Sequence, residues 1–177
     1  GGWMDKAEGV IFSNWSIGMF NEGAEYIHGQ DFGFSVDPTV LIKAAIHKDS
    51  KKIWIKTMYA KPGMSTKDIG ESNRRYAGED LIVCDSAEPR LISELKEYCN
   101  IKPTIKRSGS ILTGIALIQD FDLIIDPNST ELIKELNNYV WHERNTRPVD
   151  KWNHQLDALR YCVQYFLANA NKGVYVI

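Results

Sequence analysis

The stretch Gly29-Gln30-Asp31-Phe32-Gly33-Phe34-Ser35-Val36-Asp37-Pro38-Thr39 leads from the end of one expected strand, through a turn, to the start of another. Asp31 stands where a strand would normally place an apolar side chain against the core. A buried carboxylate is costly unless a cation or hydrogen-bond donors compensate its charge. We therefore expect Asp31 to face a charged partner or a metal ion.

The strands on either side of this stretch predict the fold. Residues 26–31, 39–46 and 52–59 have the pattern of three strands with short turns between them, which favours an antiparallel meander. Beyond residue 65 helices and strands alternate, and we expect helices at 65–76, 86–98, 110–119, 129–138 and from 150 or 153 onward, and strands at 80–85, 104–106, 123–126 and 139–142. This order predicts a mixed α/β sheet flanked by helices.

The composition is that of an ordinary globular domain. The chain has 177 residues, 44% of them hydrophobic, which is enough for a single core. With a formal net charge of -2, contact with DNA would need a local basic patch. The three cysteines lack CxxC spacing, which argues against a disulfide framework or a zinc site and favours a reducing compartment. No run approaches the roughly 20 apolar residues that span a bilayer, so we expect no membrane contact.

Two further acids lie in positions comparable to that of Asp31. Asp85 ends the apolar run 81–84, and Asp157 lies inside the amphipathic stretch 152–167. Three carboxylates on two strands and a helix can converge on Mg²⁺ or Mn²⁺, which bind oxygen ligands. Two such ions about 4 Å apart activate a water and stabilise the leaving oxygen in phosphodiester hydrolysis. The alternative is that Asp31 makes a turn, Asp85 caps a helix and Asp157 is an exposed helical acid.

Other polar residues extend this candidate site. His154 lies three residues before Asp157 and shares its helical face, as a ligand, a supporting group or a proton shuttle, with a solvent-exposed histidine as the alternative. Asp37 and Glu88 fit better as turn and first-turn helix residues. The basic turn Lys106-Arg107-Ser108-Gly109-Ser110 opens an expected helix whose backbone N–H groups favour anions. It is a candidate phosphate contact, and a merely solvated turn is its alternative.

Two nucleotide-binding signatures are incomplete in this sequence. Asp31-Phe32-Gly33 matches the magnesium-binding tripeptide of protein kinases, but the glycine-rich loop, the strand lysine and the catalytic loop are missing. No Walker A pattern occurs either, so we expect no ATP hydrolysis by this chain.

Three motifs stand out together: Asp31-Phe32-Gly33 with Asp37-Pro38-Thr39, then Cys84-Asp85-Ser86-Ala87-Glu88-Pro89, and then Asn153-His154-Gln155-Leu156-Asp157-Ala158-Leu159-Arg160-Tyr161. With the basic turn 106–110 and the following Gly114-Ile115, they resemble the nuclease domain of tailed-bacteriophage terminase large subunits, which are DNA-packaging proteins. The resemblance runs from about residue 10 to residue 166, and the last motif is its most specific part.

This resemblance implies an RNase H-like fold and a two-metal endonuclease. Such an enzyme cuts concatemeric viral double-stranded DNA during genome packaging. The resemblance makes Asp31, Asp85 and Asp157 the acids that bind two ions of Mg²⁺ or Mn²⁺. It places His154 at the same site.

The resemblance also implies a setting for the chain. The family's packaging ATPase would precede this chain and is absent from it, so residues 1–23 would be a linker and residues 24–177 the nuclease domain. The small terminase subunit and the portal ring would be its partners, besides DNA. The expected location is the host cell cytoplasm, during capsid filling.

Two other functions stay open. One is a resolvase-like or transposase-like nuclease of the same fold, which would prefer branched over linear DNA. The other is a non-catalytic module that docks on DNA or the portal. In such a module the acids would only cap and turn, and no metal-induced thermal shift would occur.

Overall fold

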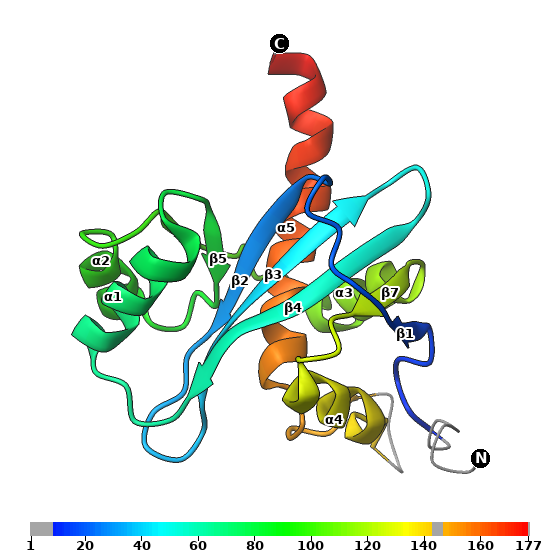
Figure 1. Cartoon of the computed structure of the whole chain (residues 1–177), viewed down its shortest axis with the longest axis horizontal. Coiled ribbons are helices and arrows are strands. Elements are labelled where there is room, and N and C mark those ends of the chain that lie inside the picture. The colour runs from blue at the N-terminus through cyan, green and yellow to red at the C-terminus, as the bar shows by residue number, and fades with distance from the viewer. Residues whose placement is uncertain (1–8, 143–146, 177) are drawn as a thin grey trace.

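A seven-stranded mixed sheet forms the centre of the molecule (Figure 1). The computed structural model describes residues 9–142 and 147–176. The strands are β1 Trp15–Ile17, β2 Tyr26–Asp31, β3 Thr39–His47, β4 Lys52–Lys61, β5 Ile82–Cys84, β6 Ile101–Pro103 and β7 Asp122–Ile125. Across the sheet they follow the order β1-β7-β4-β3-β2-β5-β6. The predicted mixed α/β sheet is therefore confirmed.

The antiparallel meander at the centre is also as predicted. β3 pairs with β2 on one side and with β4 on the other, both antiparallel. The remaining strands add in parallel: β5 joins β2, and β6 joins β5, while β7 joins β4, and β1 joins β7. The carboxyl ends of β2 and β5 consequently lie side by side.

Two predicted strands are wrong. The strand expected at 104–106 lies earlier, as β6, because Ile101 pairs with Ile82 and Pro103 ends the strand at the sheet edge, where its missing N–H does no harm. The edge strand expected at 139–142 is absent from that segment, which makes only isolated bridges through Val140 and Trp141. Both errors concern short segments whose pairing depends on distant neighbours.

Helices cover both faces of the sheet (Figure 1). The long helix α5 (His154–Val176) crosses one face against β2 and β3, and α3 (Ser110–Gln119) and α4 (Thr130–Asn138) share that face. The other face carries α1 (Thr66–Ala77) and α2 (Pro89–Leu95), the latter shorter than predicted. Because strand side chains alternate between faces, β3 sends Val40 and Ile42 toward α5 and Leu41 toward α1.

The approach of α5 to β2 depends on Gly29. A Cβ atom at this position would lie 2.2 Å from the carbonyl oxygen of Ala158, far inside van der Waals contact. Only glycine lets the helix backbone lie this close to the strand. The first turns of α5 are thereby held against the end of β2, where Asp31 lies.

The N-terminal segment contributes to the core from residue 11 onward. Ile11 and Phe12 are buried, and β1 extends the sheet beyond β7. Residues 1–8 of the predicted linker lie outside the described residues, and the boundary predicted at residue 23 stays a prediction. Within the described ranges, no helix has the length and apolarity needed to cross a membrane.

Candidate active site

Asp31, Asp85 and Asp157 come from three elements that meet at one edge of the sheet. Asp31 is the last residue of β2, and Asp85 directly follows β5, the parallel neighbour of β2. Asp157 lies in the first turn of α5, which packs against both strands. Among the described residues, none of the three carboxylates accepts a backbone N–H bond or caps a helix. The geometry thus disfavours the turn, cap and exposed-acid alternatives.

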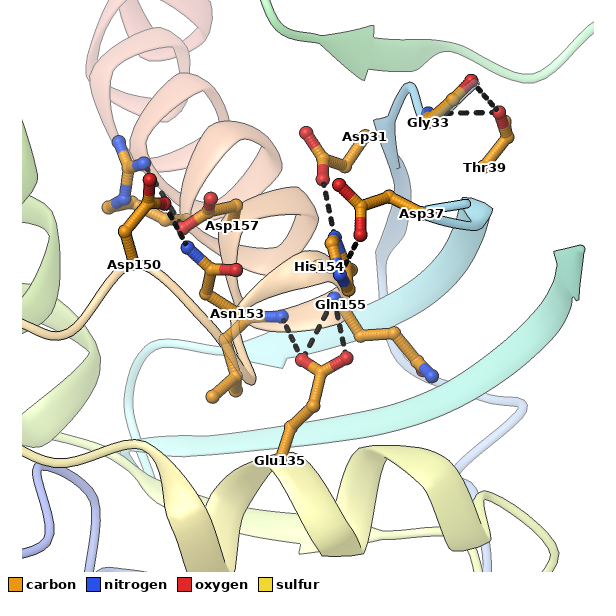
Figure 2. A network of polar contacts seen from close by, with 12 residues as sticks. Asp31, Gly33, Asp37, Thr39, Glu135, Asp150, Asn153, His154, Gln155 and Asp157 are labelled. Atoms are coloured by element: carbon orange, nitrogen blue, oxygen red, sulfur yellow. Dashed lines mark hydrogen bonds and ion pairs between the residues drawn. The ribbon is translucent and has the colours of Figure 1, made fainter. Parts of the chain in front are cut away.

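The first pair at this edge is Asp31 with His154. The Nδ1 atom of His154 lies 3.6 Å from Oδ2 of Asp31, and its Nε2 atom lies 3.6 Å from Oδ1 of Asp37 (Figure 2). Both distances are longer than an ordinary hydrogen bond, so these contacts are mainly electrostatic. Burial raises the pKa of Asp31, and the nearby Asp31 carboxylate raises the pKa of His154. Asp37, expected to be a turn residue, therefore also reaches the histidine.

Asp157 is a second carboxylate in an unfavourable place for its charge. Its side chain is 20% exposed, and burial raises its pKa to about 7. The guanidinium of Arg160 lies 3.4 Å from its Oδ1 atom and offsets this effect only in part. At neutral pH the Asp157 carboxyl is consequently divided between its protonated and ionised forms. A cation at this site would favour ionisation.

The third carboxylate, Asp85, faces a lysine. The Nζ atom of Lys106 lies 2.6 Å from Oδ1 of Asp85. This oxygen is buried and has no aligned hydrogen-bond partner among the described residues, so the contact is an ion pair. The predicted contact of Lys106 with DNA stays a prediction, and its ammonium group lies beside the acid in this structure. Arg107 and Ser108, the other predicted DNA contacts, are exposed in the turn before α3.

The three acids supply the type of ligand atom that hard divalent cations such as Mg²⁺ and Mn²⁺ prefer. All three acids offer oxygen ligands, and two of them have pKa values raised by burial. As the side chains stand, no group of three His, Cys, Asp or Glu residues in the described parts of the chain is close enough to hold an ion. Lys106 and His154 instead lie beside Asp85 and Asp31. Binding of an ion would require these side chains to rearrange locally.

Sequence reasoning missed Glu135 of α4, which binds the start of α5. Its Oε1 atom accepts the backbone N–H groups of Gln155 at 2.9 Å and of Leu156 at 3.1 Å, and its Oε2 atom lies 3.2 Å from the Gln155 nitrogen (Figure 2). Burial raises the pKa of Glu135 to about 7. An acid between Leu132 and Leu136 on an apolar helix face was the signal for such a role.

A second buried network supports the strand that carries Asp31. Gln30, the preceding residue, donates to the hydroxyl of Tyr59 at 2.7 Å and accepts from the side-chain amide of Asn73 at 2.8 Å. The Tyr59 hydroxyl in turn donates to Asn73 at 2.7 Å. These contacts join β2, β4 and α1 on the face opposite α5, so the end of β2 is held from both sides.

Comparisons with known proteins agree with this architecture. A family profile described as "Terminase RNAseH like domain" matches residues 31–165, a range that includes all three acids. The chain is 29% identical over 157 residues to the large terminase subunit of Escherichia phage T5, a match that covers 80% of this chain and 35% of that protein. This chain therefore spans about a third of the length of that relative.

Solved structures show the same fold. The nuclease domain of the g2p large terminase of bacteriophage SPP1, crystallised with bound Mn, superposes with a TM-score of 0.76 at 26% identity, over 88% of this chain and 98% of that one. The P22 large terminase nuclease domain superposes with a TM-score of 0.69 at 16% identity, over 87% and 90%. The large terminase nuclease of thermophilic phage G20c, with bound magnesium, has a TM-score of 0.60 at 16% identity, over 88% and 96%. The chain belongs to the family of terminase RNase H-like domains.

Proposed function

We propose that this domain is a metal-dependent endonuclease that cuts concatemeric viral double-stranded DNA during genome packaging. The observation that carries the proposal is the meeting of Asp31, Asp85 and Asp157 at the carboxyl ends of β2 and β5. Ligands of open α/β sheets gather at such an edge. The SPP1 and G20c nuclease domains were crystallised with bound Mn and bound Mg, which supports a divalent ion as the cofactor.

The three acids would hold one or two Mg²⁺ or Mn²⁺ ions. When bound, the metal supplies an activated water and stabilises the charge that develops on the phosphate. The protein's part is to gather the ligands. Asp31 and Asp85 are fixed by adjacent strands, while Asp157 is carried by a helix that Gly29 and Glu135 hold in place.

Two neighbouring cationic side chains act on the proton and charge balance of the site. Lys106 would have to leave Asp85 if that acid bound a metal ion, and its ammonium group would then be free to contact a DNA phosphate. The Asp31 carboxylate raises the pKa of His154, which favours the protonated form of its ring. A protonated His154 would be able to give its proton to the leaving 3′ oxygen, in the role of general acid.

The setting of the reaction belongs to the same proposal. A packaging ATPase would work together with this domain, and the small terminase subunit and the portal would be its partners. All of them would act in the host cell cytoplasm. The T5 relative, of which this chain spans about a third, is the reason to look for further domains.

Plasmid cleavage tests the proposal. Supercoiled plasmid is incubated with the protein in Mn²⁺, in Mg²⁺ and in EDTA, beside an Asp85→Asn variant whose fold is checked by circular dichroism. We expect nicking and linearisation with either metal, and loss of both in EDTA and in the variant. Equal cleavage by Asp85→Asn would show that these acids are the wrong ones. Absence of cleavage and of metal-dependent stabilisation would favour the non-catalytic docking module.

A further inference from the structure

A cavity of about 630 Å³ opens beside Asp157, between the first turn of α3, the start of α5 and residues 147–150. Three arginines contribute to its lining, namely Arg107, Arg147 and Arg160. A volume of this size accommodates a ligand of several tens of atoms at most, such as one or two nucleotides. Asp150 and Asp157 also line the cavity, so its charged side chains carry a small positive excess, and this recess adjoins the candidate metal site.

Arg160 is the buried element of this recess. Its side chain is only 8% exposed, which is unusual for arginine. Within the described parts of the chain, Asp157 is the single acceptor that approaches its guanidinium, through one contact of 3.4 Å. A guanidinium carries five N–H donors, so most of its hydrogen-bonding capacity is not used by this contact.

The packing of α3 against α5 accommodates this arginine. A Cβ atom at Gly114, in the middle of α3, would lie 2.6 Å from Cγ and 2.7 Å from Cδ of Arg160. Glycine in a helix interior is destabilising relative to alanine. Glycine occurs here despite its low helix propensity, at a position where any larger residue would displace the aliphatic part of the Arg160 side chain.

The first turn of α3 adds a second anion-binding feature. Gly109 stands at its N-cap in the left-handed region, and no side chain caps the helix. Ile111 and Leu112, whose N–H groups belong to the uncapped first turn, also line the cavity. Backbone N–H groups and the helix dipole at such a terminus favour phosphate groups.

We infer that this recess binds a phosphodiester of the DNA strand being cut, next to the scissile phosphate, with Arg160 as its buried anchor. The inference rests on the proposed nuclease function, because it assigns the neighbouring phosphate to the strand that the carboxylates act on. Arg160 spans the two places: it contacts Asp157 and lines the recess. Free phosphate has the same chemistry as a DNA phosphate, so the test must separate the two.

The test measures the affinity for labelled duplex DNA by fluorescence anisotropy, in EDTA, across a salt series. Each phosphate contact contributes about 0.9 to the slope of log affinity against log salt concentration. We expect Arg160→Met to lower this slope by about 1, so that wild type loses about 3.5-fold more affinity than the variant over a fourfold rise in salt. Arg160→Lys should keep the slope. Arg75→Ala, an exposed arginine in the last turn of α1 on the sheet face opposite α5, is the matched control and should change nothing.

Gly114→Ala provides a second test that alters no charge. It should displace the Arg160 stem and lower the slope as well, with circular dichroism confirming the fold. Unchanged slopes in folded Arg160→Met and Gly114→Ala would overturn the inference. So would loss of inorganic phosphate binding in Arg160→Met, measured by thermal shift, with an unchanged DNA slope, because the recess would then serve free phosphate. Because the assay contains no metal, its result is independent of whether Asp85→Asn abolishes cleavage.

Discussion

Replacing Glu135 with alanine removes the acceptor that binds the first turn of α5. The backbone N–H groups of Gln155 and Leu156 would lose their partner, and both residues are buried, at 1% and 3% exposure. Each buried donor left without an acceptor costs about 1–3 kcal/mol. The upper end of this range applies only if no water reaches the two free N–H groups. We therefore expect Glu135→Ala to lower the free energy of unfolding by about 2–3 kcal/mol in total near pH 5. For a chain of this size, that loss corresponds to a melting temperature roughly 5–10 °C lower.

The difference in stability between wild type and Glu135→Ala should become smaller as the pH rises. The pKa of Glu135 is raised from 4.5 to about 7, so between these values the folded state binds more protons than the unfolded state. Wild type therefore loses stability from about pH 4.5 to pH 7, because ionisation of the buried carboxyl is unfavourable. Glu135→Ala lacks this group and is spared that loss, so its deficit is largest near pH 5 and smaller at pH 8.

Thermal unfolding at pH 5 and pH 8, followed by circular dichroism, measures both effects. Glu131→Ala is the matched control, because Glu131 lies exposed on the same helix and, among the described residues, forms an ion pair with Lys134 alone. Since the first turn of α5 carries His154 and Asp157, we also expect metal-dependent cleavage to fall at least tenfold. Equal melting temperatures for Glu135→Ala and Glu131→Ala, or a loss of stability in Glu135→Ala that grows with pH, would show that Glu135 does not support α5 in this way.

Three further predictions concern the site and its support. Gly29→Ala should lower the melting temperature by several degrees and abolish cleavage, because its Cβ would lie 2.2 Å from the carbonyl oxygen of Ala158. A variant as stable as wild type would contradict the close approach of α5 to β2. Lys106→Met should lower the Mn²⁺ concentration needed for half-maximal thermal stabilisation, because an ammonium group 2.6 Å from Asp85 competes with the ion, and an unchanged midpoint would argue against competition. Asp157→Asn should raise the metal-free melting temperature at pH 8 more than at pH 5. Burial raises the pKa of Asp157 from its ordinary value of 3.8 to about 7, so ionisation of this carboxyl destabilises the folded state as the pH rises between these values. An equal change in melting temperature at both pH values would contradict this.

The parts of the fold that local patterns determine were predictable from the sequence. Alternating apolar residues and short turns identified the meander, and acids at strand ends identified the edge where Asp31 and Asp85 meet. β1 and β6 were missed or misplaced because three-residue strands carry little periodicity of their own. Their pairing depends on neighbours, such as Leu123 for Trp15, that lie far away along the chain.

The partners of the site residues were harder to predict than the residues themselves. The contact of Lys106 with Asp85 and the bond from Glu135 to the start of α5 each join elements that only the tertiary fold brings together. Helical spacing places His154 and Asp157 on one face, but it does not say that Arg160, one turn further, is buried over a glycine of α3. Long-range packing, which no local pattern encodes, decides these contacts.

A crystal soaked in Mn²⁺ and measured for anomalous scattering would show whether Asp31, Asp85 and Asp157 bind a metal ion. We expect an anomalous peak within coordination distance of Asp31, Asp85 and Asp157, with the ammonium group of Lys106 moved away from Asp85. We also expect the peak to disappear in Asp85→Asn crystals. A saturating soak that leaves these three carboxylates without a peak, with Lys106 still paired to Asp85, would contradict the claim that they form a metal-dependent nuclease site.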